Sequence, residues 1–102
     1  MEIEELRKKA YKVIEDYNKK NSLQHDKEIT FPHLVEEIGE LAREIGHEKN
    51  GWRADFNKEK LAEELIDVLI QIMNLATDYN INIEETFNKK IEALNQRYGL
   101  AQ

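Results

Sequence analysis

The sequence predicts an all-α fold, in which four helices form an antiparallel bundle that is completed by oligomerisation. Three observations support this. One proline and four glycines interrupt the 102 residues, charged residues make up 35% of the chain, and apolar residues recur at steps of three and four. Such steps are typical of amphipathic helices. Because so short a chain has room for one hydrophobic core, we expect a single domain over residues 1–102.

Charge and composition exclude several classes of partner. The formal net charge is −6, which argues against a nucleic-acid polymer or an anionic membrane as the binding partner. The chain has no cysteine, so any metal ion must bind oxygen or imidazole. Its apolar stretches fall short of the ~20 residues that a membrane-spanning helix needs. The N-terminus has no apolar block typical of a signal peptide, and we therefore expect a cytoplasmic protein.

The first two helices follow from periodicity and capping residues. A first helix is expected from about residue 2 to residue 20, with one apolar stripe that contains Ile3, Leu6, Ala10, Val13, Ile14 and Tyr17. The period is lost in the stretch NSLQHDKEIT. A second helix is expected to open with Thr30 as its N-cap and Pro32 in its first turn. Either Gly46 or Gly51 is expected to end it.

The third helix has the widest apolar surface of the four. It is expected to begin after Asn57 as its N-cap and to reach about Tyr79. Its apolar side chains from Leu61 to Ala76 spread over roughly 220° of the circumference, which is more than one core requires. A second subunit would cover the remaining side, so we expect a homodimer or a homotetramer. The alternative is a helix at the centre of a monomeric core.

A fourth helix is expected to start at Asn82. Glu85 follows three residues later, which is the spacing of a capping box. The connections are short apart from the two near residues 21–29 and 49–56, which favours antiparallel neighbours in a bundle.

The feature that suggests chemistry is a near-repeat of acidic residues. The segments LVEEIGEL and LAEELIDV recur at an offset of 27 residues. Glu37 and Glu40 lie on one helix face in the first copy, as do Glu64 and Asp67 in the second. Both pairs flank the apolar stripe, so two antiparallel helices that meet along these stripes would bring four carboxylates together.

Such a cluster needs a cation. Two like charges ~4 Å apart repel by about 4 kcal/mol at an effective dielectric constant near 20. Oxygen ligands favour Mg²⁺ or Mn²⁺, with Ca²⁺ as a further option. One alternative is that these glutamates are ordinary solvated residues on a helix surface. A di-iron bundle would need Glu-x-x-His pairs, whereas positions 40 and 67 hold Glu and Asp.

The run EEIGELAREI, followed by EELIDVLIQIMNLA and a closing KKIEALNQRYG, resembles the MazG-like members of the all-α nucleoside triphosphate pyrophosphohydrolase superfamily over about residues 28–100. The signature of these proteins is E-x-x-E on one helix and E-x-x-D on the next, and Glu36 also fits a longer E-E-x-x-E form. The resemblance implies Mg²⁺-dependent hydrolysis of a nucleoside triphosphate between its α and β phosphates, which gives a monophosphate and pyrophosphate. This reaction often clears non-canonical or surplus nucleotides. The resemblance also implies a bundle shared between subunits.

The sequence differs from the pattern of these proteins at two positions, which leaves the choice of nucleotide open. Position 71 holds Gln where relatives can place an aromatic residue that contacts the nucleoside, and Asn95 follows Lys90 by five residues instead of four. The superfamily also contains phosphoribosyl-ATP pyrophosphohydrolases with a similar second motif. A rival of another class is a non-catalytic helical interaction module with a structural cation site.

The expected roles follow from this chemistry. Glu37, Glu40, Glu64 and Asp67 are the expected metal ligands, and Glu37 is also the residue expected to orient or deprotonate the attacking water. Gln71 and Asn74 continue the polar stripe of the third helix and would bond the base or sugar, or else cap an internal water.

The remaining candidates would bind the phosphates or the base. Lys89 or Lys90, Arg97 and Arg53 are the cations available for the phosphate tail. Trp52 would stack on the base or fill a gap between helices. The three histidines, His25, His33 and His47, have no acidic or nucleophilic partner at an informative spacing, so structural or surface roles are expected for them.

Overall fold

The chain folds into four helices. The computed structural model describes residues 1–50 and 57–100, without the side chains of Lys27 and of residues 47–50. The helices are α1 (Ile3–Lys20), α2 (Lys27–Asn50), α3 (Lys58–Asp78) and α4 (Ile83–Arg97), and the described residues contain no strand. None of these described helices is long and apolar enough to cross a membrane. The predicted all-α class is confirmed.

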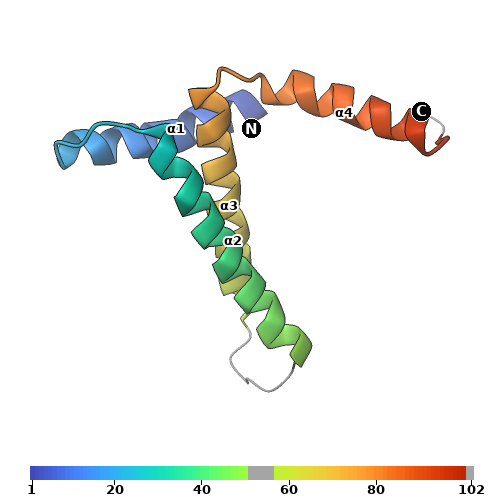
Figure 1. The fold of residues 1–102 in the computed structure, drawn as a ribbon, viewed down its shortest axis with the longest axis horizontal. Helices are drawn as coiled ribbons and strands as arrows, with labels where there is room; N and C mark the ends of the chain where they lie inside the picture. The colour runs from blue at the N-terminus through green and yellow to red at the C-terminus, as the bar shows by residue number, and fades with distance from the viewer. Residues whose placement is uncertain (51–56, 101–102) are drawn as a thin grey trace.

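The helices are arranged in the shape of a T (Figure 1). The stem is the antiparallel pair of α2 and α3, which is the most extensive packing between helices. Helix α1 crosses the top of α3, and α4 extends in the opposite direction with its contacts mainly to α1. The principal extents are 51 × 42 × 26 Å.

Asparagine caps start α3 and α4 where the sequence predicts. The Asn57 side chain accepts hydrogen bonds from the backbone N–H groups of Glu59 and Lys60, at 2.8 and 3.2 Å. The Asn82 side chain accepts one from Glu85 N at 3.0 Å. These bonds satisfy N–H groups that have no partner within the helix. The Glu85 carboxylate contacts Lys89 Nζ at 2.9 Å.

The predicted start of α2 is wrong. The helix begins before Thr30, because the Asp26 side chain accepts a hydrogen bond from Glu28 N at 2.8 Å and so acts as the cap. Thr30 is instead buried inside the helix, and Pro32 lies within it beyond the first turn. Gly46 does not end the helix, which continues to Asn50, and Gly51 lies outside the described residues.

The core within one chain is small. Its buried apolar side chains among the described residues are Ala10 of α1 with Met73 and Ala76 of α3. The two alanines allow the helices to approach closely. Beside them Arg7 Nη1 donates a hydrogen bond to Thr77 Oγ1 at 2.8 Å. This crossing fixes α1 against the upper end of the stem.

Both helices of the stem leave an apolar strip in solvent. On α2 the strip consists of Phe31, Val35, Ile38 and Ile45, and on α3 of Leu65, Ile66, Leu69 and Ile72. The α3 strip lies on the side away from the acidic residues of the same helix. The predicted wide apolar surface of this helix is therefore confirmed: one part packs within the chain and the other is exposed.

The chain is more extended than a compact domain of its length. Its radius of gyration is 16.8 Å, whereas about 13 Å is usual for 102 residues. Its accessible surface is 8239 Å², against about 6,000 Å² for a compact monomer of this mass. Many large apolar side chains of the helices are among the exposed residues.

Candidate functional site

Acidic side chains from α2 and α3 meet in the stem. Glu37, Glu40 and Glu64 each offer a carboxylate oxygen, and these three oxygens lie within 4.8 Å of one another. We call these three residues the carboxylate cluster. Antiparallel packing of the two helices brings them together, and they are three of the four acidic residues that the near-repeat expects to meet.

Two oxygens of the carboxylate cluster have no donor in the part of the chain that the structure describes. Glu37 Oε2 and Glu64 Oε2 are buried, and neither has a hydrogen-bond partner among the described residues. A buried polar atom without a partner is unfavourable, and most such atoms in proteins are satisfied. The donor set is oxygen only, which suits a hard divalent cation such as Mg²⁺. The residues present therefore fit a metal ion.

The electrostatics of the cluster also favour the binding of a cation. Burial raises the pKa of Glu37, and the negative charges of Asp67 and Glu40 raise it further. Burial likewise raises the pKa of Glu64, with added contributions from a hydrogen bond to Glu40 and from neighbouring carboxylates. None of these main contributions comes from a lysine or an arginine. Among the described residues, no basic side chain therefore compensates the like charges to a comparable extent.

Asp67, the fourth predicted ligand, lies close to the cluster but outside it. Its carboxylate is exposed and does not belong to the set of three mutually close oxygens. Its charge nevertheless raises the pKa values of both Glu37 and Glu64.

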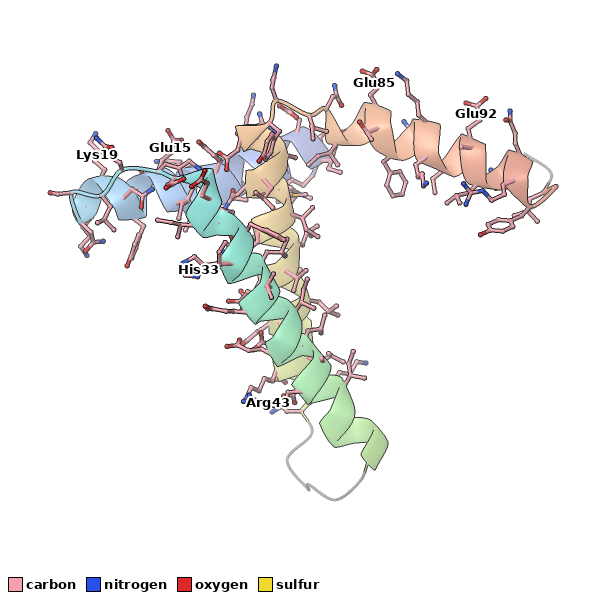
Figure 2. All side chains as sticks on the ribbon, viewed as in Figure 1. Glu15, Lys19, His33, Arg43, Glu85 and Glu92 are labelled. Atoms are coloured by element: carbon pink, nitrogen blue, oxygen red, sulfur yellow. The ribbon has the colours of Figure 1, made fainter. Side chains whose placement is uncertain are left out.

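A cavity of 260 Å³ lies between α1, α2 and α3. Gln71 of α3 and His33 of α2 both line this cavity, and Figure 2 labels His33. His33 precedes Glu37 by one helical turn, and Gln71 follows Asp67 by one turn. The cavity thus begins about one turn from the carboxylates, and we call it the stem cavity.

The other predicted substrate contacts lie in three different settings. Asn74 is 2% exposed, and its Oδ1 has no hydrogen-bond partner in the described part of the chain. Lys90 and Arg97 lie on α4, which points away from the stem, so one chain does not bring them to the carboxylates (Figure 1). Trp52 and Arg53 lie outside the described residues.

Two polar features of the fold escape prediction from the sequence. Glu44 is 3% exposed, and its Oε1 accepts a hydrogen bond from Asn57 N at 3.3 Å, which joins α2 to the start of α3. Glu44 follows Glu37 by two helical turns and so lies on the same helix face, and this spacing is the sequence pattern that could have indicated its burial. His25 contacts Asp78 at 2.7 Å, and a separation of 53 residues gives no sequence signal for that pair.

Comparison with known proteins identifies the family. The sequence is 36% identical over 93 residues to uncharacterized protein YvdC of Bacillus subtilis (strain 168), which covers 82% of this chain and 87% of YvdC. It is 35% identical over 66 residues to uncharacterized protein YpjD of the same organism, covering 63% of this chain and 60% of YpjD. No solved structure matches. The sequence model of the MazG nucleotide pyrophosphohydrolase domain matches residues 25–99, a span that includes the whole carboxylate cluster, and the chain therefore belongs to this family.

Proposed function

We propose that this protein is a Mg²⁺-dependent nucleoside triphosphate pyrophosphohydrolase that clears surplus or non-canonical nucleotides from the cytoplasmic pool. Water is added across the bond between the α and β phosphates, and the products are a nucleoside monophosphate and pyrophosphate. The observation that carries the proposal is the carboxylate cluster, in which two buried oxygens lack a donor from any described residue. The family of the chain supports the same reaction.

Glu37, Glu40 and Glu64 are the residues that would hold the cation, with Asp67 contributing from the next turn of α3. Mg²⁺ is the expected ion, and Mn²⁺ would serve the same oxygen ligands. When bound, the cation would neutralise phosphate oxygens and lower the pKa of water.

Glu37 is the residue that we assign to the attacking water. Its buried Oε2 has no donor among the described residues, so it can accept a hydrogen bond from water. Glu37 therefore has the open acceptor that orienting a water molecule needs.

The nucleoside would bind in the stem cavity. Its 260 Å³ is near the lower bound of about 300 Å³ for small-molecule sites, so it suits the nucleoside while the phosphates extend to the cluster. The Gln71 amide in its wall can donate to and accept from a base or a sugar. Buried Asn74, on the same helix, would bond to the sugar or to an internal water.

We also propose that the protein is a homodimer or homotetramer. A second copy would cover the exposed apolar strips of α2 and α3 and complete the bundle. The excess surface, about 2,000 Å², exceeds the ~800 Å² that one partner buries in a standard interface. Lys90 and Arg97 on the projecting α4 would then reach the phosphates bound to another copy.

The assembly can be tested by light scattering. The parent chain should have the mass of a dimer or a tetramer. Leu69→Asp places a charge in the exposed α3 strip, away from the carboxylates, and should shift the mass toward the monomer. A monomeric parent chain would contradict the assembly.

The activity can be tested with a panel of canonical, deoxy and damaged nucleoside triphosphates, together with phosphoribosyl-ATP. Each is incubated with the protein and Mg²⁺, and the products are resolved by phosphorus NMR. We expect monophosphate and pyrophosphate, with no orthophosphate and no reaction in EDTA. The Glu64→Gln variant should be inactive, whereas Glu92→Gln changes an exposed carboxylate on α4 and should retain activity.

Other outcomes of the same panel identify the alternatives. Hydrolysis confined to phosphoribosyl-ATP would place the protein in that branch of the superfamily. A protein that releases no pyrophosphate from any substrate would be a helical interaction module, in which the carboxylates hold a structural cation.

A further inference from the structure

The connection between α1 and α2 forms one wall of the stem cavity. Residues 23–26 of this connection line the cavity together with Gln71 of α3. The chain enters the connection through Ser22, whose φ of 55° is unusual for a residue other than glycine. The wall is therefore irregular backbone, and its position depends on what holds it.

Among the described residues, His25 carries the side-chain hydrogen bond that joins this connection to α3. His25 Nε2 lies 2.7 Å from Asp78 Oδ1. The Tyr11 hydroxyl donates to the same oxygen at 3.4 Å, and the Tyr11 and His25 rings meet edge to face with centroids 5.5 Å apart. We call His25, Asp78 and Tyr11 the histidine anchor.

The bond from His25 to Asp78, at 2.7 Å, is the strong one of the anchor, whereas the 3.4 Å contact of the Tyr11 hydroxyl is long and weak. The Asp78 side chain is 4% exposed, and hydrogen bonds to a buried carboxylate are shorter and stronger than those between neutral groups. Asp78 is the last residue of α3, and α1 packs across this end of the helix. One carboxylate thus links α1, the connection and α3.

We propose that His25 is a positioning residue, which holds the connection against the stem cavity through Asp78 and so sets how tightly the nucleoside is bound. The proposal rests on the proposed function, because it takes the stem cavity as the nucleoside site. His25 is not in the carboxylate cluster, and the helices that carry the cluster pack on each other without it. Loss of the anchor should therefore weaken substrate binding and leave the chemical step intact.

The test compares His25→Ala, which removes the ring, with His25→Gln, which keeps an N–H donor. In the free protein, hydrogen exchange of the amides of residues 21–26 should be about tenfold faster in His25→Ala, as expected for the loss of a hydrogen bond to a charged group. With the best substrate of the panel, its KM should rise about three- to tenfold, and kcat should stay within about twofold. His25→Gln should restore part of both effects.

The stabilising response to Mg²⁺ should be the same in His25→Ala as in the parent chain. Unchanged amide exchange in this variant would overturn the anchor. If amide exchange is faster in His25→Ala but its KM is unchanged, the connection does not form the nucleoside site. If kcat of this variant falls as much as its KM rises, a positioning role is excluded. A parent chain that releases no pyrophosphate would overturn the proposed function, which is a separate measurement from the exchange.

Discussion

Two acidic sites lie on α3, and they differ in how their carboxylates are neutralised. At the upper end of the helix, Asp78 is almost fully buried and accepts hydrogen bonds from His25 and Tyr11. Lower in the stem, Glu64 faces Glu37 and Glu40, and two buried oxygens there have no donor in the described part of the chain. At the first site one carboxylate oxygen, Asp78 Oδ1, has its donors within the polypeptide, whereas Asp78 Oδ2 has none among the described residues. The second gathers three carboxylates from two helices and becomes favourable when a cation joins it. A single carboxylate with donors in the polypeptide thus serves architecture, whereas the clustered carboxylates serve binding.

The largest expected effect is on activity. Glu64→Gln keeps the shape of the side chain and removes one charge from the carboxylate cluster, and pyrophosphate release should fall by at least about 100-fold. The metal-free variant should unfold at the same temperature as the parent chain or higher, because one repulsive charge is gone. Activity assays and thermal melts in EDTA provide the two readouts.

Two further variants set the limits of this result. Glu92→Gln is the matched control and should leave turnover within about twofold, since an exposed carboxylate contributes little. Asp67→Asn tests whether the fourth acidic residue is also a ligand. If it is, pyrophosphate release by Asp67→Asn should fall as far as it does in Glu64→Gln. Parental turnover in Glu64→Gln would contradict the role of the cluster.

The next effect is on stability, and its sign is opposite to that expected for the metal-free Glu64→Gln variant. Asp78→Ala leaves His25 and Tyr11 without their acceptor, and the free energy of unfolding should fall by about 1–3 kcal/mol. Urea unfolding in EDTA measures this against Glu64→Gln. If both variants changed the unfolding free energy in the same direction, the distinction between the two sites would be lost.

The smallest expected effect is a pH dependence of stability. The pKa values of Glu37 and Glu64 are raised in the fold, so their protonated forms favour the native state, and this contribution is complete below their ordinary value of 4.5. It is lost as the pH rises through the higher native values. Relative to the metal-free parent chain, Glu37→Gln should therefore become more stable as the pH is raised from acid to neutral. Urea unfolding across this range, always in EDTA, gives the difference, and a pH-independent difference would exclude a raised pKa for Glu37.

Local signals in the sequence were reliable where the local interaction decides the structure. The caps of Asn57 and Asn82 are short-range hydrogen bonds, and both form as predicted. At α2 two residues compete for the same role, and Asp26 starts the helix earlier than Thr30 would. Pro32 does not prevent this, since the helix continues through it.

The carboxylate cluster was predictable because helix periodicity fixes which residues share a face, and the antiparallel pairing of α2 and α3 then joins the two faces. The histidine anchor was not, because His25 and Asp78 meet through the crossing of α1 over α3, which no local pattern specifies. The direction of α4 is likewise a tertiary property. It separates Lys90 and Arg97 from the carboxylates within one chain.

The most direct test of the central claim, that the carboxylate cluster is a cation site, is the melting temperature as a function of Mg²⁺ concentration. A cation that binds the native state at 100 times its Kd stabilises it by about 2.7 kcal/mol, and each kcal/mol raises the melting temperature of a chain of this size by roughly 4–8 °C. We expect this rise in the parent chain and in Glu92→Gln, and little or none in Glu64→Gln. Equal responses of the parent chain and Glu64→Gln to Mg²⁺ would contradict the claim.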